Sequence, residues 1–278
     1  MNSKKSQNTK RGTSETTSKS AGSDSSNKVS PEDLWSACSV KSIGVGQATI
    51  LLYEVPIDSS TFGVSVSEKL QDHYIAEKFL RKHGHEKMAD WLKEKIPSDK
   101  KSRSGELGEI LATEFVNSSR LPFEVPIHRL VWKDGRELAM RGEDLVGFHF
   151  NSKPLGFLKG EAKSRKSLSA AVVAEARVSL KKNDGLPLAH TLSYITERLF
   201  EADEDEKAGI IERYVRERLP NPSQVSHLIF TFSQNDPSEF LQNDAKQACN
   251  PIKHYAVGLR ASDHQGLIKE IYTKAING

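Results

Sequence analysis

LGFLKGEAK, residues 155–163, reads as a buried strand that becomes polar at its last residues. Side chains alternate between the two faces of a strand, so Lys159, Glu161 and Lys163 share one face with Leu155 and Phe157. A carboxylate and an ammonium group two residues apart therefore project in the same direction from a rigid element.

A second strand is predicted just upstream, in RGEDLVGFHF at residues 141–150. Only the four residues 151–154 separate it from the first, which makes an antiparallel hairpin the simplest arrangement. The hairpin would bring Asp144 near Glu161 and Lys163. Two carboxylates and a lysine at one sheet edge form a site for hydrolysis assisted by a divalent metal ion.

A helix is predicted to begin near Ser104, which we interpret as its N-cap, and it carries two acidic residues, Glu106 and Glu109. Three residues apart, they share a side of the helix. Both are also typical acidic residues of a first helical turn, where the helix dipole favours them. Gly105 and Gly108 lower the helix propensity, and a close approach to the sheet would explain them.

The order of a helix glutamate, a strand aspartate and a Glu-x-Lys strand resembles the PD-(D/E)xK nuclease superfamily. Glu143 stands where the superfamily name has proline, a position that varies within it. The resemblance implies an α/β fold, a restriction-endonuclease-like mixed sheet flanked by helices, here with an N-terminal α/β addition. It implies catalytic roles for Asp144, Glu161, Lys163 and Glu109.

The metal ion expected at such a site is Mg²⁺, with Mn²⁺ as a substitute, because hard cations prefer oxygen ligands. The expected ligands are the Asp144 and Glu161 carboxylates, the Ala162 carbonyl and, for a second ion or a metal-bound water, Glu109. Lys163 would polarise the attacking water or the scissile phosphate. If instead the charged groups are only an exposed ion-pair cluster on a sheet, they contribute little stability and no chemistry.

A closer resemblance rests on three segments: GELGEILATEF at 105–115, LAMRGEDLVGF at 138–148 and LGFLKGEAKSR at 155–165. Together they resemble the HamA family, the nuclease subunits of the bacterial Hachiman anti-phage system. This resemblance implies a cytoplasmic DNA nuclease that forms a heterodimer with a superfamily 2 helicase. Two alternatives are a catalytically inactive module that binds DNA or protein, and a restriction-type endonuclease. The sequence contains no Walker lysine loop, so any ATP dependence must come from a partner.

Charge is distributed unevenly along the 278 residues, whose formal net charge is +3. Residues 1–30 carry six basic and two acidic side chains, so the remainder is close to neutral. Net charge therefore gives no argument for DNA binding by the folded part. Local groups of basic residues are an argument for DNA binding. We expect Arg165, Lys166 and Lys159 to contact a phosphate backbone beside the metal site.

Three regions are predicted along the chain. Residues 1–30 have almost no large apolar side chains and are expected to be a disordered tail. An N-terminal α/β lobe is expected over 31–100, and the nuclease core with C-terminal helical and strand additions over 101–278. The expected elements are strands at 48–55, 123–132, 225–232 and 255–259, and helices at 67–96, 167–181, 188–200, 206–219 and 267–275.

Overall fold

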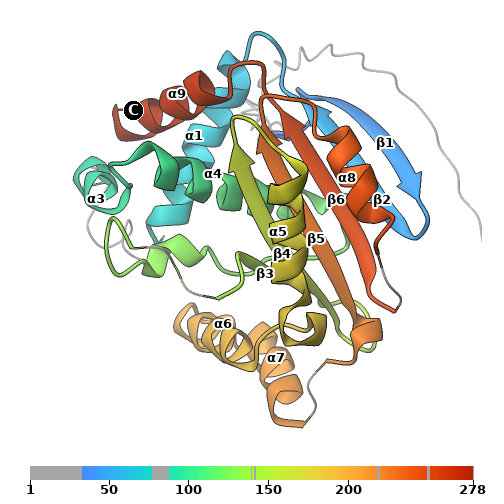
Figure 1. The fold of residues 1–278 in the computed structure, drawn as a ribbon. Coiled ribbons are helices and arrows are strands. Elements are labelled where there is room, and N and C mark those ends of the chain that lie inside the picture. The colour runs from blue at the N-terminus through green and yellow to red at the C-terminus, as the bar shows by residue number, and fades with distance from the viewer. Residues whose placement is uncertain are drawn as a thin grey trace, which may run out of the picture. The chain divides into compact units, whose positions relative to one another are not determined.

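A mixed six-stranded sheet forms the centre of the computed structural model (Figure 1). The structure describes residues 33–76, 88–138, 140, 142–217, 220–248 and 251–277, so the predicted tail at 1–30 lies outside the described residues. The strand order is β1 (Ser39–Val45), β2 (Ala48–Glu54), β6 (Lys253–Arg260), β5 (Val225–Ser233), β4 (Gly156–Arg165) and β3 (Leu145–His149). The four inner strands are parallel, and each edge strand pairs antiparallel with its neighbour.

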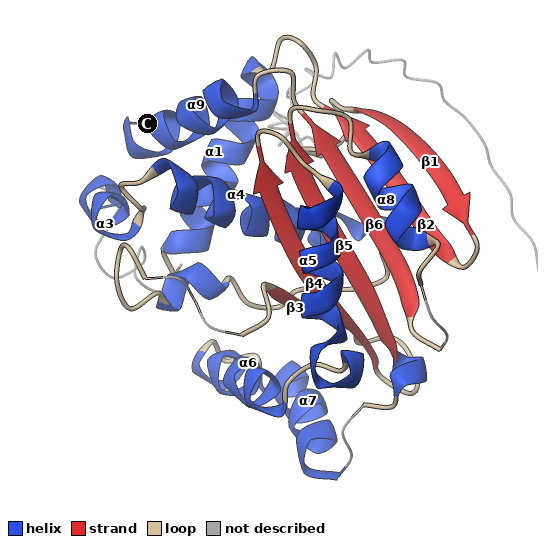
Figure 2. Ribbon diagram, in the orientation of Figure 1, coloured by secondary structure: helices blue, strands red, loops and turns tan. Residues whose placement is uncertain are grey.

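Helices cover both faces of the sheet, as Figure 2 shows. One apolar core lies between the sheet and the helices α1 (Ser60–Tyr74), α3 (Met88–Lys95), α4 (Lys100–Phe115) and α9 (His264–Asn277). The opposite face packs against α5 (Ala170–Lys181) and α8 (Ser238–Ala245). A third core joins β3 to α6 (Ala189–Glu201) and α7 (Asp205–Glu217). Short helical turns occur at Val116–Arg120, Arg129–Trp132, Lys182–Gly185 and Pro222–Gln224. The predicted α/β fold with a mixed sheet flanked by helices is confirmed.

Burial explains the inner strands. Every residue of β5 is buried, which is typical of a parallel strand covered on both faces. The described part of residues 31–100 contributes β1 and β2 to this same sheet, and β2 pairs in parallel with β6. The sheet thus runs across the boundary predicted at residue 100. Among the described residues, no helix combines the length and apolar character needed to cross a membrane.

The predicted hairpin is confirmed. β3 and β4 pair antiparallel, with Leu145 opposite Gly160 and His149 opposite Gly156. Continuing this register by one residue places Asp144 opposite Glu161. The alternation of side chains and the short connection were sufficient to predict the pairing, because a slip of one residue would turn the apolar side chains away from the core.

The strand predicted at 123–132 is wrong. The segment makes one isolated bridge, Glu124 to Phe148, and then turns into the 3₁₀ helix Arg129–Trp132. Pro126 has no N–H to donate to a ladder. The Asn117 side chain hydrogen-bonds both backbone groups of Val125. It accepts from the N–H at 2.8 Å and donates to the carbonyl at 3.1 Å, so neither group pairs with a strand.

The N-cap predicted at Ser104 is also wrong, because α4 begins at Lys100 and its cap is Asp99, whose carboxylate accepts from Ser102 N–H at 2.9 Å. Ser104 lies inside the helix and its hydroxyl contacts that of Ser164 on β4 at 2.8 Å. The helix predicted at 67–96 is divided: α1 begins earlier and ends at Tyr74, α3 follows, and residues 77–87 lie outside the described residues.

Candidate active site

Asp144 and Glu161 lie where β4 extends beyond the first residue of β3. β3 begins at Leu145, opposite Gly160, so from Glu161 onward one edge of β4 has no strand partner among the described residues. The Asp144 carboxylate occupies that edge, and its Oδ2 accepts the Ala162 N–H at 2.9 Å. This bond satisfies a backbone donor that the end of the ladder would otherwise leave unpaired. It also fixes the Asp144 side chain beside the Glu161–Lys163 segment.

Lys163 lies against Glu161. Its Nζ is 2.6 Å from Glu161 Oε1, and both side chains are largely but not wholly buried, at 19% and 11% exposure. As predicted, both project to the same side of β4. This contact places the amino group of Lys163 at the edge of the carboxylate cluster.

Helix α4 brings Glu109 to the same place. Arg129 links the two elements: its Nη1 donates to the Asp144 carbonyl at 2.8 Å and lies 3.5 Å from Glu109 Oε2. A small cavity of about 10 Å³ is lined by Glu109, Asp144 and Arg129 among others. Helix, strand start and strand edge therefore converge on one point.

Burial and neighbouring charge shift the pKa values of two carboxyl groups in the cluster. Burial and the negative charge of Asp144 raise the pKa of Glu109 to about 8, although Arg129 opposes the shift. Burial and the charge of Glu161 likewise raise the pKa of Asp144 to about 6. Like charges in a desolvated site disfavour ionisation. A cation bound here would favour the ionised forms of both carboxyl groups.

Glu106, the other helix glutamate, serves a different purpose. It is buried and accepts hydrogen bonds from the Tyr74 hydroxyl and from Lys133 Nζ. Lys133 Nζ donates in addition to the Arg136 carbonyl at 2.6 Å. Glu106 is thus held in an internal ion pair, and Glu109 is the helix carboxylate that lies beside Asp144.

A divalent metal ion fits this donor set. The carboxylates of Asp144, Glu161 and Glu109 supply only oxygen ligands, as Mg²⁺ prefers, and two or three carboxylates suffice because Mg²⁺ retains several waters. Burial and neighbouring negative charge raise the pKa values of Glu109 and Asp144, and a bound cation would offset both effects. Ala162 donates its N–H to Asp144, and the role of its carbonyl as a ligand stays a prediction.

The three basic residues predicted to bind DNA differ in position. Lys159 is buried, and its Nζ donates to the carbonyls of Lys182 and Leu186 at 2.8 and 3.0 Å. It also lies 3.8 Å from Glu143 Oε1, so the prediction that it meets a phosphate backbone is wrong. Arg165 is partly exposed and Lys166 is exposed, so both stay candidates for contact with DNA.

Comparison with known proteins shows the family of this chain. A sequence model of the HamA family matches residues 35–275, which include all four predicted catalytic residues. The chain belongs to the HamA family. It is 29% identical over 199 residues to the Hachiman protein HamA of Bacillus cereus. The aligned region covers 72% of this chain and 70% of that protein. Membership of the HamA family, part of Hachiman anti-phage defence, supports a role in defence.

Sequence analysis missed Arg129, which contacts both Glu109 and the Asp144 carbonyl and so links the helix to the strand start. The residue falls within the segment predicted as a strand, where an arginine is a common residue. Only the tertiary path of residues 123–132 places it at the site. A signal was available in Pro126, which argues against an inner strand, but it does not indicate where the arginine points.

A second group of possible metal ligands comes from α1, α4 and the residue before the 3₁₀ helix Arg129–Trp132. His73, Glu114 and His128 offer ligand atoms within 4.8 Å of one another. His73 Nε2 is 2.9 Å from Glu114 Oε1, and the two imidazole rings stack with centroids 3.9 Å apart. Stacked rings lie in separate parallel planes, so their nitrogen lone pairs do not converge on one point. The geometry favours a hydrogen bond between His73 and Glu114 that joins α1 and α4.

Proposed function

We propose that this chain is a Mg²⁺-dependent DNA nuclease, the effector of an anti-phage defence complex that it forms with a helicase. The observation that carries the proposal is the convergence of Asp144, Glu161 and Lys163 at one sheet edge, with Glu109 held beside them by Arg129. An ion-pair cluster with only a structural role would not need three carboxylates that repel one another.

Phosphodiester hydrolysis requires an activated water, in-line attack and neutralisation of the phosphoryl oxygens. When bound, Mg²⁺ supplies a Lewis acid for the first and last of these. Asp144 and Glu161 would hold the ion, and Glu109 would hold a second ion or one of its waters. Lys163 Nζ would orient the attacking water or the scissile phosphate, from its position 2.6 Å from Glu161. Arg165 and Lys166 would hold the flanking backbone.

The helicase partner follows from two considerations. The sequence contains no Walker lysine loop, so coupling of cleavage to ATP needs another chain. An intact nuclease site would also threaten the host chromosome, which calls for a partner that restrains it. The segments that flank the site, 31–100 and 185–278, are the surfaces we propose for docking.

Cleavage of labelled linear and circular DNA by the full chain tests the proposal. The chain is purified alone and with a co-expressed helicase, and assayed in Mg²⁺ and in EDTA. We expect cleavage in Mg²⁺ only, and its loss in Glu161→Gln. Glu175→Gln is the matched control, since Glu175 is an exposed glutamate on α5. DNA binding without any cleavage, unchanged by Glu161→Gln, would favour the inactive binding module instead.

A further inference from the structure

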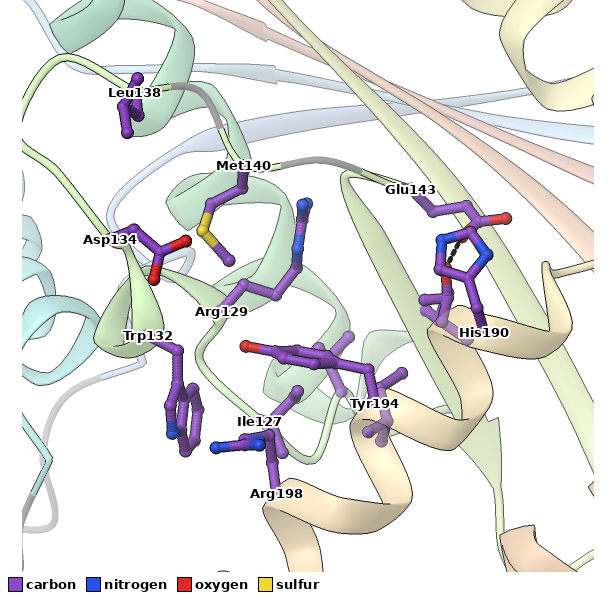
Figure 3. Close-up of a pocket in the computed structure, with 14 residues that line it drawn as sticks. Ile127, Arg129, Trp132, Asp134, Leu138, Met140, Glu143, His190, Tyr194 and Arg198 are labelled. Atoms are coloured by element: carbon purple, nitrogen blue, oxygen red, sulfur yellow. Dashed lines mark hydrogen bonds between the residues drawn. The ribbon is translucent and has the colours of Figure 1, made fainter.

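A large pocket adjoins the carboxylate cluster. Its volume is about 890 Å³, within the roughly 300–1,000 Å³ typical of ligand sites. Figure 3 shows Trp132 and Asp134 on one side of it, and His190, Tyr194 and Arg198 of α6 on the other. Arg129 lines this pocket and also the small cavity between Glu109 and Asp144, so the two spaces share a wall.

Two polar atoms in this wall have no hydrogen-bond partner although both are buried. They are the Tyr194 hydroxyl and Arg198 Nε. Buried polar atoms are nearly always paired, since leaving one unpaired costs the lost hydration. Both atoms could form hydrogen bonds with a ligand that carries acceptor atoms at its edge.

The same residues offer flat surfaces. The rings of Trp132 and Tyr194 have centroids 6.5 Å apart at 83°. The Arg198 guanidinium lies over both, 5.8 Å from the Trp132 centroid and 5.3 Å from that of Tyr194. Aromatic rings and guanidinium planes are the surfaces on which unpaired bases stack.

The flat surfaces and the two unpaired polar atoms favour a nucleobase over an apolar protein side chain as the ligand. An apolar side chain of a protein partner would fill the space but leave the Tyr194 hydroxyl and Arg198 Nε unpaired. A nucleobase has a π face for the rings and acceptor atoms at its edge for both donors. It also enters joined to a phosphate. Arg129 lines both the pocket and the small cavity beside Glu109 and Asp144, and its guanidinium would attract that charge.

We propose that the pocket binds one unpaired base of the strand that the neighbouring carboxylates cut. This inference rests on the proposed nuclease function and adds a substrate class to it: single-stranded DNA, or duplex DNA whose strands have been separated locally. The reaction that supplies such a substrate is strand separation.

Binding is measured with the full chain carrying Glu161→Gln, so that DNA stays intact. The probe is a single-stranded oligonucleotide with 2-aminopurine, and the reference is the same sequence in a fully paired duplex. We expect quenching of the fluorescent base and preference for the single strand. Trp132→Leu should weaken this binding by about 5- to 100-fold through lost stacking. Tyr194→Phe, which removes only the hydroxyl, should weaken it by about 3- to 10-fold.

Phe200→Leu is the matched control, because Phe200 is an exposed aromatic residue of the same helix, 43% accessible, and does not line the pocket. Photocrosslinking of a 5-iododeoxyuridine strand to the Glu161→Gln protein keeps both aromatic rings and does not depend on the stability of Trp132→Leu. We expect the crosslink at Trp132 or Tyr194.

Equal binding by both pocket variants and the control, with crosslinks elsewhere, would overturn the base pocket. If the variants instead weaken only helicase association, the pocket docks a protein and the inference fails. Failure of the nuclease proposal is recognised separately: the chain with Glu161 intact would then cut no DNA in Mg²⁺ even with the helicase and ATP, whatever the binding titration shows.

Discussion

The pKa of Glu109 depends on both burial and neighbouring charge. Burial and the Asp144 carboxylate raise its pKa to about 8, from an ordinary value of 4.5. A carboxyl group whose pKa is raised by folding binds its proton more tightly in the folded chain than in the unfolded chain. Its contribution to stability is therefore full below the unfolded value and is lost as the pH rises through the folded value.

We predict that Glu109→Gln stabilises the metal-free chain above pH 8 and has little effect near pH 4.5. The gain should be on the order of 1–3 kcal/mol, reduced by the lost contact with Arg129. Thermal unfolding in EDTA across this pH range measures it. Mg²⁺ should raise the melting temperature of the unaltered chain more than that of the variant. Equal melting temperatures at high pH would show that Glu109 is not strained by its neighbours.

Substitutions of Lys163 and Lys166 should have different effects, one on the cleavage rate and the other on DNA binding. Lys163 contacts Glu161, whereas Lys166 is exposed just beyond the strand. We predict that Lys163→Ala lowers the cleavage rate at saturating DNA by about 10²-fold or more, with the fold retained. Lys166→Ala should weaken DNA binding mainly at low salt and leave the saturated rate close to normal. If Lys166→Ala lowered the saturated rate and Lys163→Ala only weakened binding, the roles assigned to the two lysines would be wrong.

The contact between α4 and β4 sets the geometry of the site at the scale of elements. A Cβ on Gly108 would lie 3.1 Å from Ser164 Cβ, so this glycine permits the close approach that sequence analysis expected. Gly105 is different, because a Cβ there would meet nothing within 4 Å. The expected explanation thus holds for one glycine and not for the other.

We predict opposite outcomes for alanine at these two positions. Gly105→Ala should stabilise the chain by about 0.5–1 kcal/mol, since alanine favours the helix and the space is open. Gly108→Ala should be less stable than Gly105→Ala by about 1–3 kcal/mol, because the helix must move away from β4. It should also slow cleavage by displacing Glu109. Denaturant unfolding and cleavage rates measure both effects; a Gly108→Ala chain as active and stable as Gly105→Ala would contradict this account.

Elements with a regular period could be predicted from sequence, and elements fixed by single contacts could not. The β3–β4 pairing follows from alternating side chains and a short loop. Residues 123–132 have the composition of a strand, yet Pro126 and the Asn117 side chain prevent a ladder. Lys159 alternates correctly with Glu161, but its burial depends on carbonyls that follow α5, which no local pattern reveals.

Across the whole molecule, the site draws on segments that are distant in sequence. Arg129, Glu109 and the β3–β4 hairpin converge at one end of the sheet, and α6 contributes the pocket beside them. Sequence analysis predicted the hairpin, and placed Glu109 on a helix, because each is a local motif. The pairing of β2 with β6 and the position of the α6 pocket depend on long-range packing, so they needed the structure.

At this scale we predict that activity depends on a second chain. Co-expression with the helicase should produce a stable heterodimer in which cleavage requires both ATP and Mg²⁺. Size-exclusion chromatography and a cleavage assay with and without ATP test this. Full-rate cleavage by the isolated chain, with no association and no effect of the helicase, would leave an autonomous nuclease.

The most direct test of the central claim is the position of a bound metal ion. Crystals of the full chain grown with Mn²⁺, with data collected for anomalous scattering, locate the ion without reference to activity. The account predicts an anomalous peak between the carboxylates of Asp144 and Glu161, and its loss in Glu161→Gln. A peak at His73, Glu114 and His128 instead, or no peak near Asp144 at a saturating concentration of Mn²⁺, would contradict the assignment of the active site.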